Sequence, residues 1–140
     1  MRKLLLLIPV ILVASSAWAK PAPSLYKRLG AKPGITKIVN RFVNTLSSDP
    51  RLMANPKLKE ASIQMKPADV KRDLVEKLCE ASGGPCKVKR AIFLGAPPDT
   101  KLAPAEWFYV IQGAMETLKA ARVSEADQRE MIGLLTAQRK

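Results

Sequence analysis

Apolar residues recur along this chain at the spacing of an α-helix. In the strongest pattern, six of them follow one another at the intervals that place side chains on one face of a helix. We expect this helix to begin at residues 33–34 and to end at residues 47–50, where serines, an aspartate and a proline follow one another. The six apolar positions are Ile35, Ile38, Val39, Phe42, Val43 and Leu46.

Two further apolar stripes of the same kind follow. One begins at Pro67, a residue suited to a first helical turn, and ends at residues 83–85, where two glycines and a proline stop a helix. The other begins at Pro104. We therefore predict two more long helices, with apolar faces formed by Val70, Leu74, Leu78 and Cys79 in the first and by Trp107, Val110, Ile111, Ala114, Leu118 and Ala121 in the second.

Shorter signals mark the remaining elements. Ser24 is expected to cap a short helix, and Ser124 with Asp127 resembles a capping box that opens a final helix. Residues 51–66 hold apolar residues without a clean period, which predicts a loop with a weak helical turn, and residues 87–102 fit a short helix ended by glycine. No segment alternates β-branched with polar residues between turns. The sequence therefore predicts an all-α fold.

The first 19 residues have the pattern of a cleaved leader. Two basic residues precede an apolar run of 11 residues, and small residues follow at positions 17 and 19. A membrane-spanning helix needs about 20 apolar residues, so this run is too short to be an anchor. We predict a signal peptide over residues 1–19, export to the periplasm, and one domain over residues 20–140.

The charge of the chain is strongly positive and unevenly placed. Residues 20–90 contain 16 Lys and Arg against 6 Asp and Glu, whereas residues 91–140 contain 6 of each kind. Such a field attracts anions, which favours an anionic protein or a membrane surface as a partner, although a basic background that keeps the protein soluble also explains it. Export and an aromatic content of 5% disfavour nucleic acid. The basic face predicted for this partner comprises Lys71, Arg72, Lys87, Lys89 and Arg90.

The chain contains no histidine. The commonest general base, the commonest metal ligand and the usual activator of a serine or cysteine nucleophile are therefore missing. Its 12 acidic residues are scattered and are expected on solvated helix faces. We predict that the protein holds no metal site and is not an enzyme, unless it binds haem, which would open the way to chemistry such as the removal of peroxide or nitric oxide.

Cys79 and Cys86 lie on either side of the turn formed by residues 83–85. Two cysteines without histidines are too few for a closed zinc or iron–sulfur site. A disulfide and a pair of buried thiols both fit the pattern. We favour the disulfide because an exported protein meets an oxidising compartment.

Three segments of the chain form a recognisable set. The first comprises residues 24–30, 33–35 and the helix from Ile38 to Leu46 with residues 49–51; the second is residues 78–87; the third runs from Leu102 through the last two helices. Together they resemble the group 1 truncated haemoglobins over nearly all of residues 24–140. The resemblance implies a two-over-two helical sandwich that holds haem, with a histidine on the iron.

Three positions depart from the family's pattern. The family's ligand histidine follows an alanine, and the similarity on both sides places Ala96 and Pro97 there; proline has no side-chain donor atom. Many members have tyrosine after the phenylalanine of the second helix, where this chain has Val43 after Phe42. An aromatic pair expected within residues 51–55 is also absent. The departures predict a globin scaffold that has lost histidine-ligated haem.

We therefore expect an exported, non-enzymatic domain without a cofactor that binds an anionic partner or a small apolar ligand. The alternative is a haem protein that binds oxygen or another diatomic gas through Met, Cys, Lys or Tyr on the iron. The resemblance places the pocket for either ligand among Phe42, Val43, Leu74, Leu78, Phe93, Trp107 and Ile111.

Overall fold

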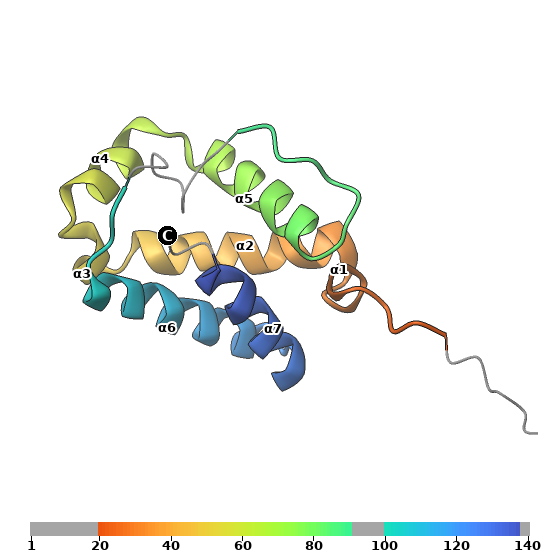
Figure 1. Cartoon of the computed structure of the whole chain (residues 1–140). Helices are drawn as coiled ribbons and strands as arrows, with labels where there is room; N and C mark the ends of the chain where they lie inside the picture. The colour runs from red at the N-terminus through yellow and green to blue at the C-terminus, as the bar shows by residue number, and fades with distance from the viewer. Residues whose placement is uncertain (1–19, 91–99, 138–140) are drawn as a thin grey trace, which may run out of the picture.

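The computed structural model describes residues 20–90 and 100–137. Every helix or strand assigned within these two ranges is an α-helix (Figure 1). The elements are α1 (Leu25–Arg28), α2 (Ala31–Ser47), α3 (Pro50–Met53), α4 (Pro56–Gln64), α5 (Pro67–Ala81), α6 (Pro104–Ala120) and α7 (Glu125–Thr136). The all-α prediction is confirmed for this part of the chain.

Two pairs of helices form the body of the fold. α2 packs against α5, α6 packs against α7, and α2 also contacts α6, which joins the two pairs. Figure 1 shows α2 running between α5 on one side and the α6–α7 pair on the other. The short helices close the ends: α1 contacts α2 and α7, whereas α3 contacts α2 and α6. This arrangement is the two-over-two sandwich that the resemblance to truncated haemoglobins implied.

The prediction of a loop over residues 51–66 was wrong, because two short helices occupy most of this segment. The Asp49 side chain accepts a hydrogen bond from the backbone N–H of Arg51, and Asn55 does the same for Lys57 and Leu58. A proline follows each cap at the first helical position, where its fixed φ angle and missing N–H cost nothing. Caps and prolines therefore define these helices, and apolar periodicity does not show them.

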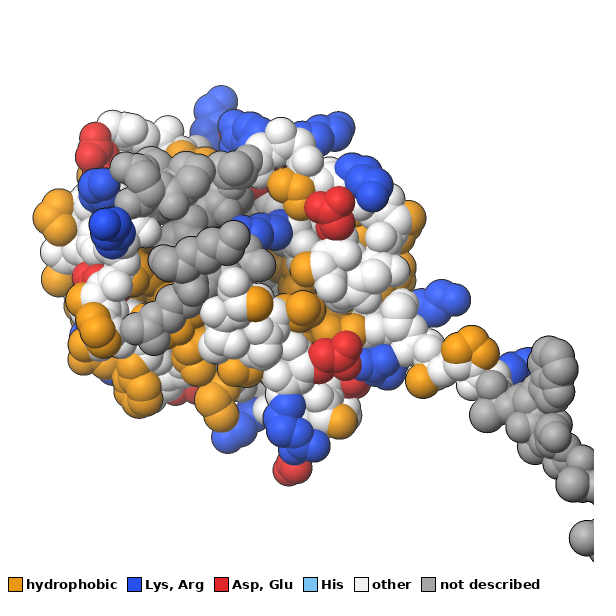
Figure 2. Space-filling model, viewed as in Figure 1, with side chains coloured by type: hydrophobic (Ala, Val, Ile, Leu, Met, Phe, Trp, Pro, Cys, Tyr) orange, Lys and Arg blue, Asp and Glu red, His pale blue; other side chains and the backbone are white. Residues whose placement is uncertain are grey.

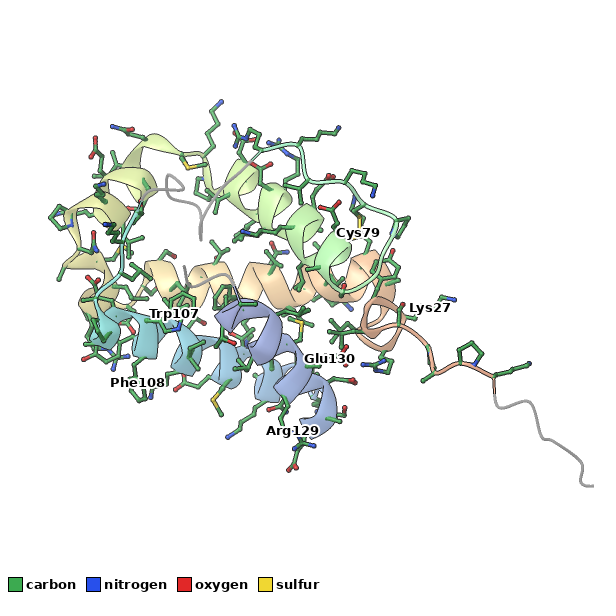
Figure 3. All side chains as sticks on the ribbon, viewed as in Figure 1. Lys27, Cys79, Trp107, Phe108, Arg129 and Glu130 are labelled. Atoms are coloured by element: carbon green, nitrogen blue, oxygen red, sulfur yellow. A yellow bond between two sulfur atoms is a disulfide. The ribbon has the colours of Figure 1, made fainter. Side chains whose placement is uncertain are left out.

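The predicted apolar stripes form most of the core. α2 contributes Ile35, Ile38 and Val39, and α6 contributes Trp107, Val110, Ala114 and Leu118, all buried. Figure 3 shows Trp107 pointing inward from α6 and its neighbour Phe108 pointing away, with 5% and 63% of their surfaces exposed. Helical periodicity therefore orients both long helices correctly.

The buried face of α5 is rotated by about one residue from the apolar stripe that we predicted for this helix. Val75 and Cys79 are the fully buried positions of this helix, and Leu74 and Leu78 are half-buried beside them. Val75 did not belong to the predicted stripe, because Val70, Leu74 and Leu78 form a self-consistent series at intervals of four. Ala121 is exposed because α6 has already ended when the chain reaches it.

Cys79 and Cys86 form the predicted disulfide, and their Cα atoms lie 5.7 Å apart. The left-handed backbone of Gly83, with φ of +84°, turns the chain so that the second cysteine returns to the first. Cys79 itself is fully buried in the core beside Val75. The bridge therefore attaches the segment after α5 to the last turn of that helix.

The predicted signal peptide of residues 1–19 and the predicted short helix ended by Gly95 lie outside the described residues, the latter in residues 91–99. Among the helices that are described, none combines the length and the apolar character needed to cross a membrane.

Candidate functional site

A cavity of about 120 Å³ lies where α2, α5, α6 and α7 meet. Three of the predicted pocket residues line it, Phe42 from α2 and Leu74 and Leu78 from α5. α6 and α7 supply the remaining walls, mainly with apolar side chains that include Leu118 and Met131. The sandwich therefore contains a partly open apolar cavity at the centre of the predicted pocket.

The other predicted pocket residues lie elsewhere. Val43 lines a neighbouring cavity of about 210 Å³ between α2, α4 and the start of α5, which shares Phe42 and Leu74 with the first. Trp107 is buried in the core near Leu52, and Ile111 packs half-buried against the same cluster. Phe93 and Pro97 lie outside the described residues. The predicted pocket is thus divided between two cavities and a solid cluster.

Thr117 is a polar residue among those that line the first cavity. The residue is 2% exposed, and its Oγ1 has no hydrogen-bond partner among the described residues. A buried hydroxyl without a partner is uncommon in folded proteins and costs free energy. Sequence reasoning missed this residue because it is polar, although it follows Ala114 at the three-residue spacing of the α6 stripe.

Lys77 is the charged residue of the same wall. Burial among the apolar residues lowers the pKa of its ammonium group, because a charged amine is poorly solvated there. Sequence reasoning missed this residue too, since a lysine between two leucines of an amphipathic helix normally faces solvent. The cavity is therefore apolar apart from one hydroxyl and the side chain of Lys77.

Histidine-ligated haem does not fit this set of residues. The chain contains no histidine, and both cysteines are consumed by the disulfide. Met131 is the only side chain lining the described cavity that belongs to the common axial-ligand types. No group of three or more residues suited to hold a metal ion occurs among the residues that the structure describes.

The predicted basic face carries acidic partners. Arg72 pairs with Asp69 at 2.7 Å and with Asp73 at 3.1 Å, and Asp73 also pairs with Arg90. Burial opposes the ionisation of Asp73, but the hydrogen bonds from Arg90 and Arg72 outweigh it and lower the pKa of the carboxyl. These pairs neutralise much of the charge that the sequence predicted for this face.

The other members of the basic face differ in exposure, with Lys87 and Lys89 exposed. Lys87 lies 3.7 Å from Glu80, Lys71 is half-buried, and Lys89 shares with Arg72 and Arg90 a hollow of about 290 Å³ that also contains two acids. In Figure 2 the blue basic side chains are spread over the visible face with red acidic ones among them. The structure thus places Arg72, Lys89 and Arg90 together, but in a hollow of mixed charge.

The sequence matches no protein-family model and no curated protein. Its fold, in contrast, is similar to that of truncated hemoglobin from Tetrahymena pyriformis in the Fe(III) form. The two share 19% sequence identity with a TM-score of 0.64, over 84% of this chain and 95% of the other. A single-substitution variant of the same protein aligns over the same shares of both chains, with a TM-score of 0.63. The chain therefore has the truncated-globin fold.

Proposed function

We propose that this chain is an exported, non-enzymatic protein that binds a small apolar ligand carrying one polar atom in the cavity between α2, α5, α6 and α7. The unpartnered Thr117 hydroxyl, 2% exposed in an apolar wall, is the observation that carries the proposal. The leader-like pattern of residues 1–19 supports export.

The size of the cavity limits the ligand. An apolar cavity of about 150 Å³ engineered into another protein takes up benzene, whereas pockets for drug-sized ligands measure about 300–1,000 Å³. At about 120 Å³, this cavity suits a molecule near the size of a single aromatic ring. The apolar walls favour its hydrocarbon part, and rotation of the Thr117 side chain toward the cavity would give its polar atom a partner.

Phenol and benzene provide a direct test, because they differ by one hydroxyl. Titration calorimetry of the whole mature protein should show saturable binding of both, with phenol preferred about fivefold, the ratio expected for one hydrogen bond of about 1 kcal/mol. T117V keeps the shape of the side chain and removes the hydroxyl, so the preference for phenol should be lost or reversed, because the phenol hydroxyl would then be buried without a partner. Absence of saturable binding, or an unchanged preference in T117V, contradicts the proposal.

A second candidate function is haem binding through Met131, which lines the cavity and belongs to a known axial-ligand type. Haem bound there would supply the iron that binds a diatomic gas. The absorption spectrum of protein with added haem separates the two functions. A Soret band that shifts with carbon monoxide and is lost in M131L would establish the haem function; a spectrum of free haem alone agrees with the first proposal.

A further inference from the structure

A wide hollow of about 1,050 Å³ lies between the polar face of α2 and the turn that joins α6 to α7, away from the basic face considered above. It is lined by Lys37 and Arg41 from α2 and by Arg122 from the turn. All three are exposed, and none has an ion-pair partner within the described ranges. We call this surface the α2 groove. Its three cations are unpaired among the described residues, whereas much of the charge of the basic face is neutralised by acidic partners.

At the end of the α2 groove next to α1, the positive charge is balanced by acidic residues. Arg28 lines it there, but this arginine is held by Asp127 and Glu130 of α7. The walls also carry neutral hydrogen-bonding side chains, Asn40, Asn44 and Ser48, spaced four residues apart along one face of α2. The groove therefore combines positive charge with groups that both donate and accept hydrogen bonds.

Arg122 adopts a backbone conformation that normally selects glycine. Its φ is +57°, and it closes α6 with two bonds, from its own N–H to the carbonyl of Lys119 and from the N–H of Val123 to that of Leu118. The same pair of bonds ends α5, and there the left-handed position is Gly83. A long cationic side chain at this position is a strained choice for the fold alone, which points to a use for the side chain.

We propose that the α2 groove binds an extended acidic peptide segment of a partner protein. This binding is independent of the ligand proposed for the apolar cavity. The lining residues of α2 run from Gly34 to Ser48, about 20 Å along the helix axis, the length of about six residues of extended chain. Peptide groups of such a segment match the asparagine and serine side chains, and its carboxylates match Lys37, Arg41 and Arg122.

Two other anions fit this surface less well. A single phosphate would occupy only a small part of a hollow of this length. A membrane surface is broad and flat, so it would meet the convex parts of the protein before the floor of a groove. A concave, elongated site with separated cations favours a chain over either one.

A fluorescently labelled octaglutamate peptide tests the proposal by anisotropy at low salt, with octaglutamine as the uncharged control peptide. The double variant K37Q/R41Q should weaken binding at least about fivefold. K71Q/K89Q removes the same charge from the basic face and should change binding less than about twofold. Equal losses in the two variants would show an effect of net charge alone and would overturn the proposal, as would a peptide that does not saturate.

Variants of Arg122 distinguish an effect on peptide binding from an effect on folding. R122G should raise the melting temperature by a few degrees, because glycine relieves the left-handed strain, and should weaken the peptide about threefold. R122K keeps both the charge and the strain and should leave both measurements near those of the parent protein. Unchanged peptide affinity in R122G would contradict the role of this side chain. Phosphatidylglycerol vesicles that bind through Lys37 and Arg41, while the peptide does not, would overturn the assignment of the partner.

Discussion

Arg28 Nε donates a hydrogen bond of 2.7 Å to Asp127 Oδ1, although 99 residues separate the two in the sequence. The second carboxylate oxygen accepts from the hydroxyl of Ser124, the residue that caps α7. Hydrogen bonds, first from Arg28 and then from Ser124, lower the pKa of Asp127 below its ordinary value. One carboxylate thus ties α1 to the start of α7.

This arrangement predicts a loss of stability in acid. A carboxyl whose pKa is lowered by folding stabilises the folded state above its unfolded pKa, about 3.9, and this contribution is lost as the pH falls through the folded value. D127N should therefore cost about 1 kcal/mol at pH 7 and less at pH 3. Urea unfolding at both pH values measures the difference, and an equal cost at both would refute the link.

Two glycines predict opposite effects of the same substitution. A Cβ on Gly34 would lie 1.8 Å from the carbonyl oxygen of Leu29, so α1 and α2 cannot keep their approach in G34A. We expect a loss of at least about 3 kcal/mol in the free energy of unfolding, as for other severe steric changes.

Gly133 in α7 is the matched control, since a Cβ there meets nothing within 4 Å. G133A should stabilise the protein by about 0.5–1 kcal/mol, because alanine loses less backbone entropy in a helix. Chemical unfolding of both variants tests the pair. A tolerated G34A would show that the junction of α1 and α2 is looser than the structure indicates.

The disulfide predicts a dependence of stability on redox conditions. Cys79 and Cys86 are seven residues apart, and closing a loop this short is expected to contribute about 2–3 kcal/mol through the unfolded state. Reductant should therefore lower the melting temperature of the protein. C86S, which leaves the buried Cys79 in place, should resemble the reduced protein and should not respond to reductant. A response of the same size in C86S would place its cause elsewhere.

Thr117 predicts a gain of stability on removal of a polar atom. In protein free of ligand, T117V should raise the free energy of unfolding by about 1 kcal/mol, because the parent buries a hydroxyl without a partner. Ser82 provides a contrast, since its equally buried hydroxyl donates to the carbonyl of Leu78 at 2.6 Å. S82A should therefore destabilise the protein. A similar loss in T117V would mean that its hydroxyl is bonded.

The features that sequence reasoning predicted are those with local signals. The stripe of α2 and that of α6 repeat every three or four residues, and Gly83 marks the end of α5, so the elements and most of the core follow from patterns within single segments. The cysteines lie close enough in sequence for their pairing to be weighed from the turn between them. These relationships need no knowledge of how the helices pack.

Sequence reasoning missed two kinds of feature. Some depend on partners that are distant in sequence, and one depends on a polar atom that has no hydrogen-bond partner. Asp73 neutralises Arg90 across 17 residues, which no composition count of a basic segment reveals. Lys37, Arg41 and Arg122 line the same groove only because α2 packs beside the end of α6. The unpartnered state of Thr117 depends on every atom around it.

The disulfide also affects the wall that α5 contributes to the apolar cavity. Leu78 and Ala81 stand on either side of Cys79 in the last turn of α5, and both line the cavity. The wall is therefore fastened by a bond that forms only where thiols become oxidised. Under reducing conditions this wall is unfastened, so the full capacity to hold the proposed ligand would arise only after the two thiols have been oxidised.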